Sequence, residues 1–131
     1  MERLYPKEVD VHTLSPLALA FVGDGVYSLL VRERLLTIAN RPVNDLHHLA
    51  VSAVRAEAQS AAMERLLPRL TPEEETVFKR GRNAHTARSG AEYHRATGLE
   101  SLFGYLYLSG QLARVRELFS LCVEEVLTDG N

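Results

Sequence analysis

Helix-start signals recur along this chain, whereas signals for β-strands are almost absent. Ser15 and Thr71 are each followed by a proline. Their hydroxyl groups can cap the start of a helix, and proline is well tolerated at the first helical position. Glu74 stands three residues after Thr71 and completes the pattern of a capping box. Runs of β-branched residues are few, and no turn dipeptide joins two alternating segments. The sequence therefore predicts an all-α fold.

Six helical segments are expected between the capping and breaking signals. They cover residues 17–38, 46–51, 52–67, 72–83, 92–108 and 111–127. Gly23 and Gly25 interrupt the first segment, which is either one long helix with a point of close packing or two abutting helices. Residues 1–13 are expected to form an arm, and residues 84–91 a loop of small and polar side chains. Because no repeat and no linker is visible, residues 1–131 are predicted to form one domain.

Composition and charge exclude several classes of protein. The 131 residues carry a net charge of −2, which excludes a uniformly basic nucleic-acid-binding protein but allows a local basic patch. Cys122 is the single cysteine, so an intrachain disulfide is impossible and a reducing compartment is favoured. No apolar run reaches the ~18–20 residues that span a bilayer. We therefore expect a cytoplasmic protein without a membrane segment.

Positive charge is concentrated in residues 79–95. This segment has five cations and one acid, whereas the rest of the chain has ten cations and 16 acids. Thirteen of the 15 cations are arginine, which forms bidentate contacts with phosphate groups. The residues expected to contact phosphate are Lys79, Arg80, Arg82, Asn83, His85, Arg88 and Arg95. A solvated helix end explains the same charge equally well at this stage, because Lys and Arg favour helix C-termini.

Two carboxylates lie in helical runs that are otherwise apolar. Asp24 lies between two glycines in the first run, and Glu100 lies in the stretch that begins at Gly98. No cation lies at helical spacing from either acid, so neither can form a local ion pair. One interpretation is capping: Asp24 would cap a second helix after Gly23, and Glu100 would form a capping box with Thr97. The other is a shared divalent ion, because Mg²⁺ is commonly held by one or two carboxylates and water.

Four motifs together resemble the ribonuclease III family. Residues 17–27, Leu-Ala-Leu-Ala-Phe-Val-Gly-Asp-Gly-Val-Tyr, are similar to the family's signature helix, which contains Gly-Asp followed by Ala or Gly. Residues 97–108, Thr-Gly-Leu-Glu-Ser-Leu-Phe-Gly-Tyr-Leu-Tyr-Leu, resemble its second acidic helix. Residues 51–59 and 80–84 are similar to the short Mini-ribonuclease III branch, which has the catalytic domain and no double-stranded RNA-binding domain. The resemblance covers residues 15–110.

The chain departs from full-length ribonuclease III at two of that family's four site carboxylates. Asp24 and Glu100 match two of them, and the other two positions hold Ala20 and Thr97. Each of these positions is one helical turn from a retained acid, so a carboxylate there would lie on the same helix face as that acid. Mini-ribonuclease III proteins resemble this chain in lacking both acids, so the departure favours that branch.

The resemblance implies an all-α homodimer in which each protomer cuts one strand of an RNA duplex. It implies that Asp24 and Glu100 are the catalytic residues and hold Mg²⁺, which Mn²⁺ can replace, and that an activated water attacks the phosphodiester. The products would carry 5′-phosphate and 3′-hydroxyl ends. It further implies that the substrate is precursor large-subunit (23S) ribosomal RNA, whose ends are matured, and that residues 79–95 hold the duplex.

Two other functions are compatible with these residues. A non-catalytic RNA-binding or ribosome-associated protein could have the same fold, because loss of site acids also accompanies loss of activity. An all-α dimerisation module could use the arginine cluster to bind a protein partner. Retention of Asp24 and Glu100 favours the enzyme, since a decayed site has no reason to keep two uncompensated acids.

Overall fold

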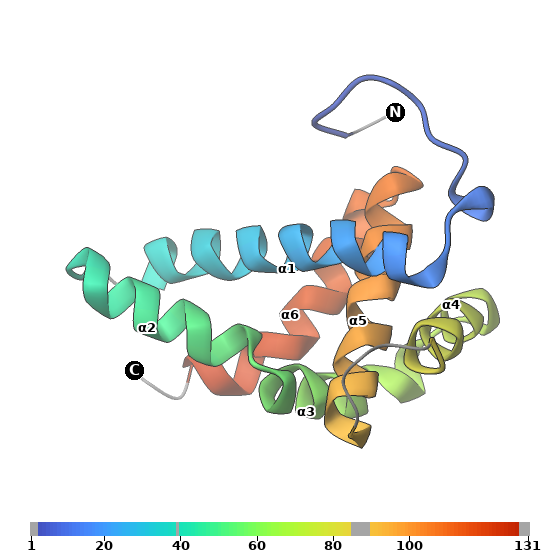
Figure 1. Cartoon of the computed structure of the whole chain (residues 1–131). Helices are drawn as coiled ribbons and strands as arrows, with labels where there is room; N and C mark the ends of the chain where they lie inside the picture. The colour runs from blue at the N-terminus through green and yellow to red at the C-terminus, as the bar shows by residue number, and fades with distance from the viewer. Residues whose placement is uncertain (1–2, 39, 85–89, 129–131) are drawn as a thin grey trace.

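The computed structural model describes residues 3–38, 40–84 and 90–128, with side chains up to residue 123, and every regular element in these ranges is a helix (Figure 1). The α-helices are α1 (Pro16–Ile38), α2 (Val43–Val54), α3 (Ala56–Leu66), α4 (Pro72–Arg82), α5 (Ala91–Leu108) and α6 (Leu112–Thr128). Two short 3-10 helices are η1 (Val11–Thr13) and η2 (Leu67–Arg69). None of the described helices is long and apolar enough to cross a membrane. The prediction of an all-α fold is confirmed.

Two of the predicted helix starts have the expected capping geometry. Ser15 Oγ accepts a hydrogen bond from the backbone N–H of Ala18 at 3.1 Å, and α1 then continues as one unbroken helix. At the start of α4, Thr71 Oγ1 accepts from Glu74 N at 3.2 Å, and Glu74 Oε1 accepts from Thr71 N at 2.9 Å. Arg114 of α6 donates two further hydrogen bonds to the Glu74 carboxylate, at 2.8 and 2.9 Å. The capping box therefore also ties α6 to α4.

The boundary between the second and third helices differs from the prediction. α2 ends at Val54 and α3 begins at Ala56, so the boundary expected at residue 52 is wrong. Arg55 between them has an extended backbone, with φ −65° and ψ 152°. This break lets both helices bury an apolar residue in one core, Ala50 from α2 and Met63 from α3. No glycine or proline marks the break in the sequence, which is why the pattern did not predict it.

α5 is the central helix of the fold and packs against α1, α3, α4 and α6 (Figure 1). Gly98 lies against Phe78 of α4, whose ring would be 2.6 Å from a Cβ atom at that glycine. Tyr27 of α1 contacts Phe103 of α5 and Phe119 of α6 edge to face, with ring centroids 5.3 and 5.4 Å apart. These aromatic contacts fix the position of α1 relative to α5 and α6.

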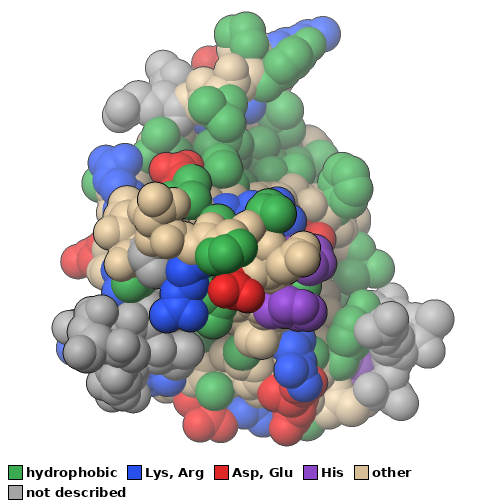
Figure 2. Space-filling model, turned by 90° about the vertical axis from the view of Figure 1, so that its left-hand side faces the viewer, with side chains coloured by type: hydrophobic (Ala, Val, Ile, Leu, Met, Phe, Trp, Pro, Cys, Tyr) green, Lys and Arg blue, Asp and Glu red, His purple; other side chains and the backbone are tan. Residues whose placement is uncertain are grey.

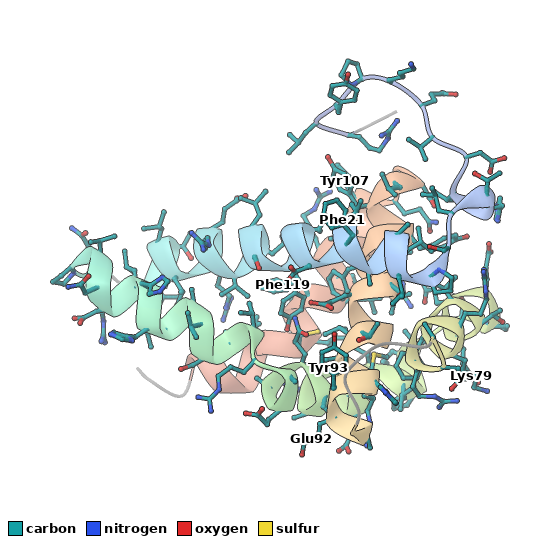
Figure 3. The ribbon with its side chains drawn as sticks, in the orientation of Figure 1. Phe21, Lys79, Glu92, Tyr93, Tyr107 and Phe119 are labelled. Atoms are coloured by element: carbon teal, nitrogen blue, oxygen red, sulfur yellow. The ribbon has the colours of Figure 1, made fainter. Side chains whose placement is uncertain are left out.

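One face of α1 is apolar and exposed. Phe21 is 82% exposed and lies on the side of α1 that faces the N-terminal arm (Figure 3). Leu17 and Leu29 are exposed at helical spacing from Phe21. A groove of about 740 Å³ runs along the same helix and is lined mainly by apolar side chains, among them Val26 and Tyr107. Figure 2 shows hydrophobic side chains gathered in the upper part of the molecule, below the arm.

Candidate active site

α1 and α5 cross at two glycines. Gly23 of α1 lies against the backbone carbonyl of Glu100, and a Cβ atom at Gly23 would overlap that oxygen and lie 2.8 Å from Gly104 N. Gly104 of α5 lies in turn against the carbonyl of Leu19, which a Cβ atom there would also overlap. The two backbones are in contact, and only residues without a Cβ atom allow this. The crossing brings Asp24, the neighbour of Gly23, to the carboxyl group of Glu100.

The carboxyl groups of Asp24 and Glu100 form a close pair at this crossing. Glu100 is partly buried, whereas Asp24 is exposed. Burial, followed by the charge and the hydrogen bond of Asp24, raises the pKa of the Glu100 carboxyl to about 8. Two acids that share a site in this way repel each other when both are ionised. A divalent cation bound between them would remove that repulsion.

A third polar group reaches the pair from α3. Gln59 is 2% exposed, and its amide lies beside Glu100, where it favours the ionised carboxylate and lowers its pKa. The Nε2 atom of Gln59 is buried and has no hydrogen-bond partner of normal geometry among the described residues. Buried polar groups in native proteins are almost always paired. An open amide beside two carboxyl groups therefore fits a site that a bound ion and its water complete.

Neither acid is a helix cap. Asp24 lies in the middle of α1 and Glu100 in the middle of α5, so the alternative interpretation of both as capping residues is wrong. Thr97, the expected partner of Glu100 in a capping box, donates its hydroxyl to the carbonyl of Tyr93 at 3.0 Å. α5 already begins at Ala91, so Thr97 is an interior residue of that helix. The closeness of the two acids supports the interpretation as a shared cation site.

The donor set at the crossing fits Mg²⁺ or Mn²⁺. Ala20 and Thr97 are both buried, and neither adds a charge to the site. Within the described part of the chain, no group of three or more His, Cys, Asp or Glu side chains is placed to hold a metal ion. A cation here would have ligands from Asp24 and Glu100 and would complete its shell with water or substrate oxygens, as Mg²⁺ commonly does. Oxygen donors without thiolate or imidazole favour Mg²⁺ and Mn²⁺ over softer metals.

The described residues of the basic segment lie at the end of α4 and at the start of α5, where Figure 3 shows Lys79 and Glu92. Two of its cations have acidic partners. Lys79 Nζ lies 2.8 Å from the Glu75 carboxylate, and Arg95 Nη1 lies 2.8 Å from the carboxylate of Glu64 on α3. Ion pairs at the surface contribute little free energy, so these partners do not prevent contact with phosphate.

Three further residues of the segment, Arg80, Arg82 and Asn83, lie at the C-terminal end of α4. Arg80 is exposed, and the guanidinium of Arg82 lies 5.6 Å from the centroid of the Phe78 ring. Arg82 Nε also donates to Asn83 Oδ1 at 3.2 Å. The last two residues expected to contact phosphate, His85 and Arg88, lie outside the described residues.

Sequence reasoning missed Gln59. The motif that contains it was noted for its resemblance, but the amide itself was not assigned a role. The signal was its position, because Gln59 lies on the same helix face as Ala62, Met63 and Leu66, all of them buried. A polar side chain on an apolar face needs a partner, and that requirement points to a site. The identity of the partner, Glu100, depends on the packing of α3 against α5.

Comparison with known families identifies the fold and the class of protein. The family described as the Ribonuclease III domain matches residues 17–111, a range that contains Asp24, Gln59 and Glu100. This chain belongs to the ribonuclease III family. Membership confirms the family predicted from the sequence motifs, and with it the prediction of an endoribonuclease.

Similar proteins and a solved structure support the same family assignment. A Mini-ribonuclease 3 from Symbiobacterium thermophilum is 47% identical over 117 residues, which cover 86% of this chain and 90% of the relative. One from Enterococcus faecalis is 43% identical over 124 residues, covering 89% and 94%. The crystal structure of a Fusobacterium nucleatum protein superposes with a TM-score of 0.79 at 25% identity, covering 91% of this chain and 98% of that one. Within the ribonuclease III family, the chain therefore falls in the Mini-ribonuclease 3 branch, as predicted.

Proposed function

We propose that this ribonuclease III family member cuts double-stranded RNA with Mg²⁺ held by Asp24 and Glu100. The observation that carries the proposal is the contact between these two carboxyl groups at the α1–α5 crossing, within the matched domain. Mn²⁺ can replace Mg²⁺ at a site built from carboxylate oxygens. The reaction is hydrolysis of a phosphodiester bond, which leaves a 5′-phosphate and a 3′-hydroxyl end.

The two carboxylates have different surroundings and therefore different roles. Asp24 is exposed, so it is open to both the ion and the RNA. Glu100 is partly buried at a crossing of two backbones, which holds its position rigidly, as a precise site requires. Mg²⁺ bound there supplies a polarised water and neutralises charge on the phosphoryl oxygens. Because the Glu100 carboxyl has a raised pKa of about 8, protons compete with the ion for this ligand below that pH.

The basic segment 79–95 is proposed to hold the RNA duplex. Duplex RNA is recognised mainly through its shape, its phosphates and its 2′-hydroxyls. Arg80 and Arg82 offer such contacts from α4, which packs against the helix that carries Glu100. We propose precursor 23S ribosomal RNA as the substrate and the cytoplasm as the location, as the resemblance of the sequence motifs to the Mini-ribonuclease III branch implies.

A homodimer that forms through the apolar face of α1 completes the proposal. Phe21 projects from this face beside the groove that Val26 and Tyr107 line. A two-fold contact would place the same patch of both copies together and remove these side chains from water. Two copies would provide two carboxylate pairs, one for each strand of the duplex. The single domain, residues 1–131, would then need its partner to cut both strands.

Cleavage of a structured RNA duplex tests the proposed function. The purified protein is incubated with an end-labelled duplex and, separately, with one of its single strands, each with Mg²⁺ or with EDTA. We expect defined products from the duplex only, and only with Mg²⁺, and their ends should be 5′-phosphate and 3′-hydroxyl. Binding of the duplex without any cleavage in Mg²⁺ or Mn²⁺ would instead support a non-catalytic RNA-binding protein on this fold.

A further inference from the structure

Gln59 is the most unusual polar residue of the core. Its side chain is 2% exposed, and its Nε2 atom has no hydrogen-bond partner of normal geometry in the described part of the chain. A buried donor without a partner costs free energy on folding, so a protein keeps one only where something else requires it. An apolar side chain of the same size would pack at this position without that cost.

The amide of Gln59 is directed at one particular group. α3 packs against α5, and this contact places the Gln59 amide beside the carboxyl of Glu100. An amide N–H donates to a carboxylate oxygen, so the Gln59 side chain offers Glu100 a buried donor from a neighbouring helix. The ionised carboxylate only accepts hydrogen bonds, through both oxygens, whereas the protonated form has an O–H donor; the ionised form is also the one that binds a cation.

We propose that Gln59 is a positioning residue of the cation site, whose buried amide orients the Glu100 carboxylate toward the bound ion. This inference rests on the proposed function of Asp24 and Glu100. Glu100 would be ionised when it holds a cation, and its carboxylate would then offer Gln59 Nε2 an acceptor that pairs the orphaned donor. Carboxylates that bind metals are commonly held by a second hydrogen-bonded group in this way.

A neutral amide suits this role better than a charged side chain. A lysine or arginine at residue 59 would form an ion pair with Glu100 and compete with the cation. A third acid would add to the repulsion that Glu100 already experiences from Asp24. Glutamine fixes the direction of the carboxylate without changing the charge of the site. This matters in a site where Ala20 and Thr97 contribute no acid.

The test measures cation binding in protein without RNA. Gln59→Met keeps the length of the side chain and removes the amide, and Gln59→Leu is a second variant of similar volume. Mn²⁺ is titrated into each protein and the free ion is measured by electron paramagnetic resonance. We expect the Kd for Mn²⁺ to rise by about 10-fold or more, the usual effect of removing a group that orients a metal ligand. The Tm of the metal-free variants should stay the same or rise, because an unpaired buried donor is lost.

Ser101→Ala is the matched control. Ser101 is also a fully buried polar residue, next to Glu100 on α5, but its hydroxyl donates to Pro16 O at 2.8 Å. This variant should lower the Tm and leave the affinity for Mn²⁺ unchanged, so a general effect of disturbing the core is separated from an effect on the ligand.

Two outcomes would overturn the inference: one rejects only the role of Gln59, and the other also rejects the proposed cation site. If both Gln59 variants bind Mn²⁺ as the wild type does, while Asp24→Asn and Glu100→Gln bind it more weakly, the role of Gln59 is wrong and the cation site stands. If Asp24→Asn and Glu100→Gln also bind Mn²⁺ as the wild type does, the proposed site itself is wrong.

Discussion

Gly23 of α1 lies directly against the backbone carbonyl of Glu100 on α5, with no room for a Cβ atom between them. This contact determines how the two helices cross, and the crossing determines where Asp24 meets Glu100. The chemistry of the candidate site therefore depends on a residue that has no side chain. The relationship also explains why an acid lies beside a glycine in the otherwise uncharged first part of α1, up to Val31.

Replacement of this glycine should disrupt the fold as well as the site. Gly23→Ala places a methyl group against the carbonyl of Glu100, and backbone atoms have little freedom to move away. We expect a loss of about 3 kcal/mol or more in the free energy of unfolding, at the upper end of the cost of overpacking. Gly25→Ala is the matched control, because nothing lies within 4 Å of a Cβ atom there. That variant should be stabilised by up to about 1 kcal/mol, as alanine favours helix. If Gly23→Ala and Gly25→Ala were equally stable in urea denaturation, this account of the crossing would be contradicted.

Removal of the charge of Glu100 should stabilise the protein when no metal is bound. The pKa of Glu100 is raised from 4.5 to about 8 in the folded state, first by burial and then by Asp24. The folded protein therefore holds this proton more tightly than the unfolded chain does, and the resulting stability is full below about pH 4.5 and is lost as the pH rises toward 8. Glu100→Gln does not titrate, so in EDTA its Tm should exceed that of the wild type by an amount that grows from pH 5 to pH 8.

Mg²⁺ provides the control for the Glu100 variant. The ion should raise the Tm of the wild type at pH 8 and reduce the difference, because it stabilises the ionised pair. A difference in Tm that stays constant across this pH range and does not respond to Mg²⁺ would contradict this account. It would mean that the surroundings do not disfavour the ionised Glu100 carboxylate and that Glu100 does not bind Mg²⁺.

The apolar face of α1 is expected to hold two copies of the chain together. Phe21→Lys places a charge at the most exposed aromatic position of that face, where a partner would bury it at a high cost. Sedimentation should give a monomer for this variant and about twice the chain mass for the wild type at micromolar concentration. Leu67→Lys, at an exposed position of η2 between α3 and α4, is the matched control and should remain dimeric. A wild-type monomer that still cuts both strands of a duplex would rule out the proposed dimer.

The arginines at the end of α4 should contribute affinity for RNA of any sequence. Each contact with phosphate contributes roughly 0.9 to the slope of log K against log salt, by the value for B-form DNA. The double variant Arg80→Ala and Arg82→Ala should therefore weaken binding to different duplexes by similar factors and flatten the slope by about one to two units. Arg41→Ala, which removes an exposed cation between α1 and α2, should leave the slope unchanged. An unaltered slope in the double variant would mean that the duplex is held by other residues.

Local signals in the sequence predicted the helices with few errors, because helix starts depend on neighbours in the chain. Ser15 and Thr71 cap their helices through contacts three residues away, so their residue types are sufficient evidence. The break at Arg55 was not predicted, since no residue type marks it and only the packing of α2 and α3 requires it. Secondary structure was thus accessible from the sequence wherever a local contact determined it.

The candidate site was predicted only in part, because its contacts join segments that are far apart in the chain. Asp24 and Glu100 were recognised as uncompensated acids, but their meeting depends on the close approach at Gly23 and Gly104. The role proposed for Gln59 depends on the packing of α3 against α5, for which the sequence carries no local signal. The family resemblance supplied the pairing of the two acids, and the geometry supplied the third residue.

The rate of duplex cleavage by Asp24→Asn tests the central claim most directly. The substitution keeps the shape of the side chain and removes its charge, and Asp45→Asn removes the same charge from an exposed position of α2 as the matched control. Under single-turnover conditions with saturating RNA and Mg²⁺, the account predicts that Asp45→Asn cuts at the wild-type rate. Asp24→Asn should keep its circular dichroism spectrum and lose more than about 100-fold in rate, since losing a metal ligand should exceed the 10- to 100-fold cost of losing a supporting group. Mg²⁺-dependent cleavage by Asp24→Asn at close to the wild-type rate would contradict the assignment of the site.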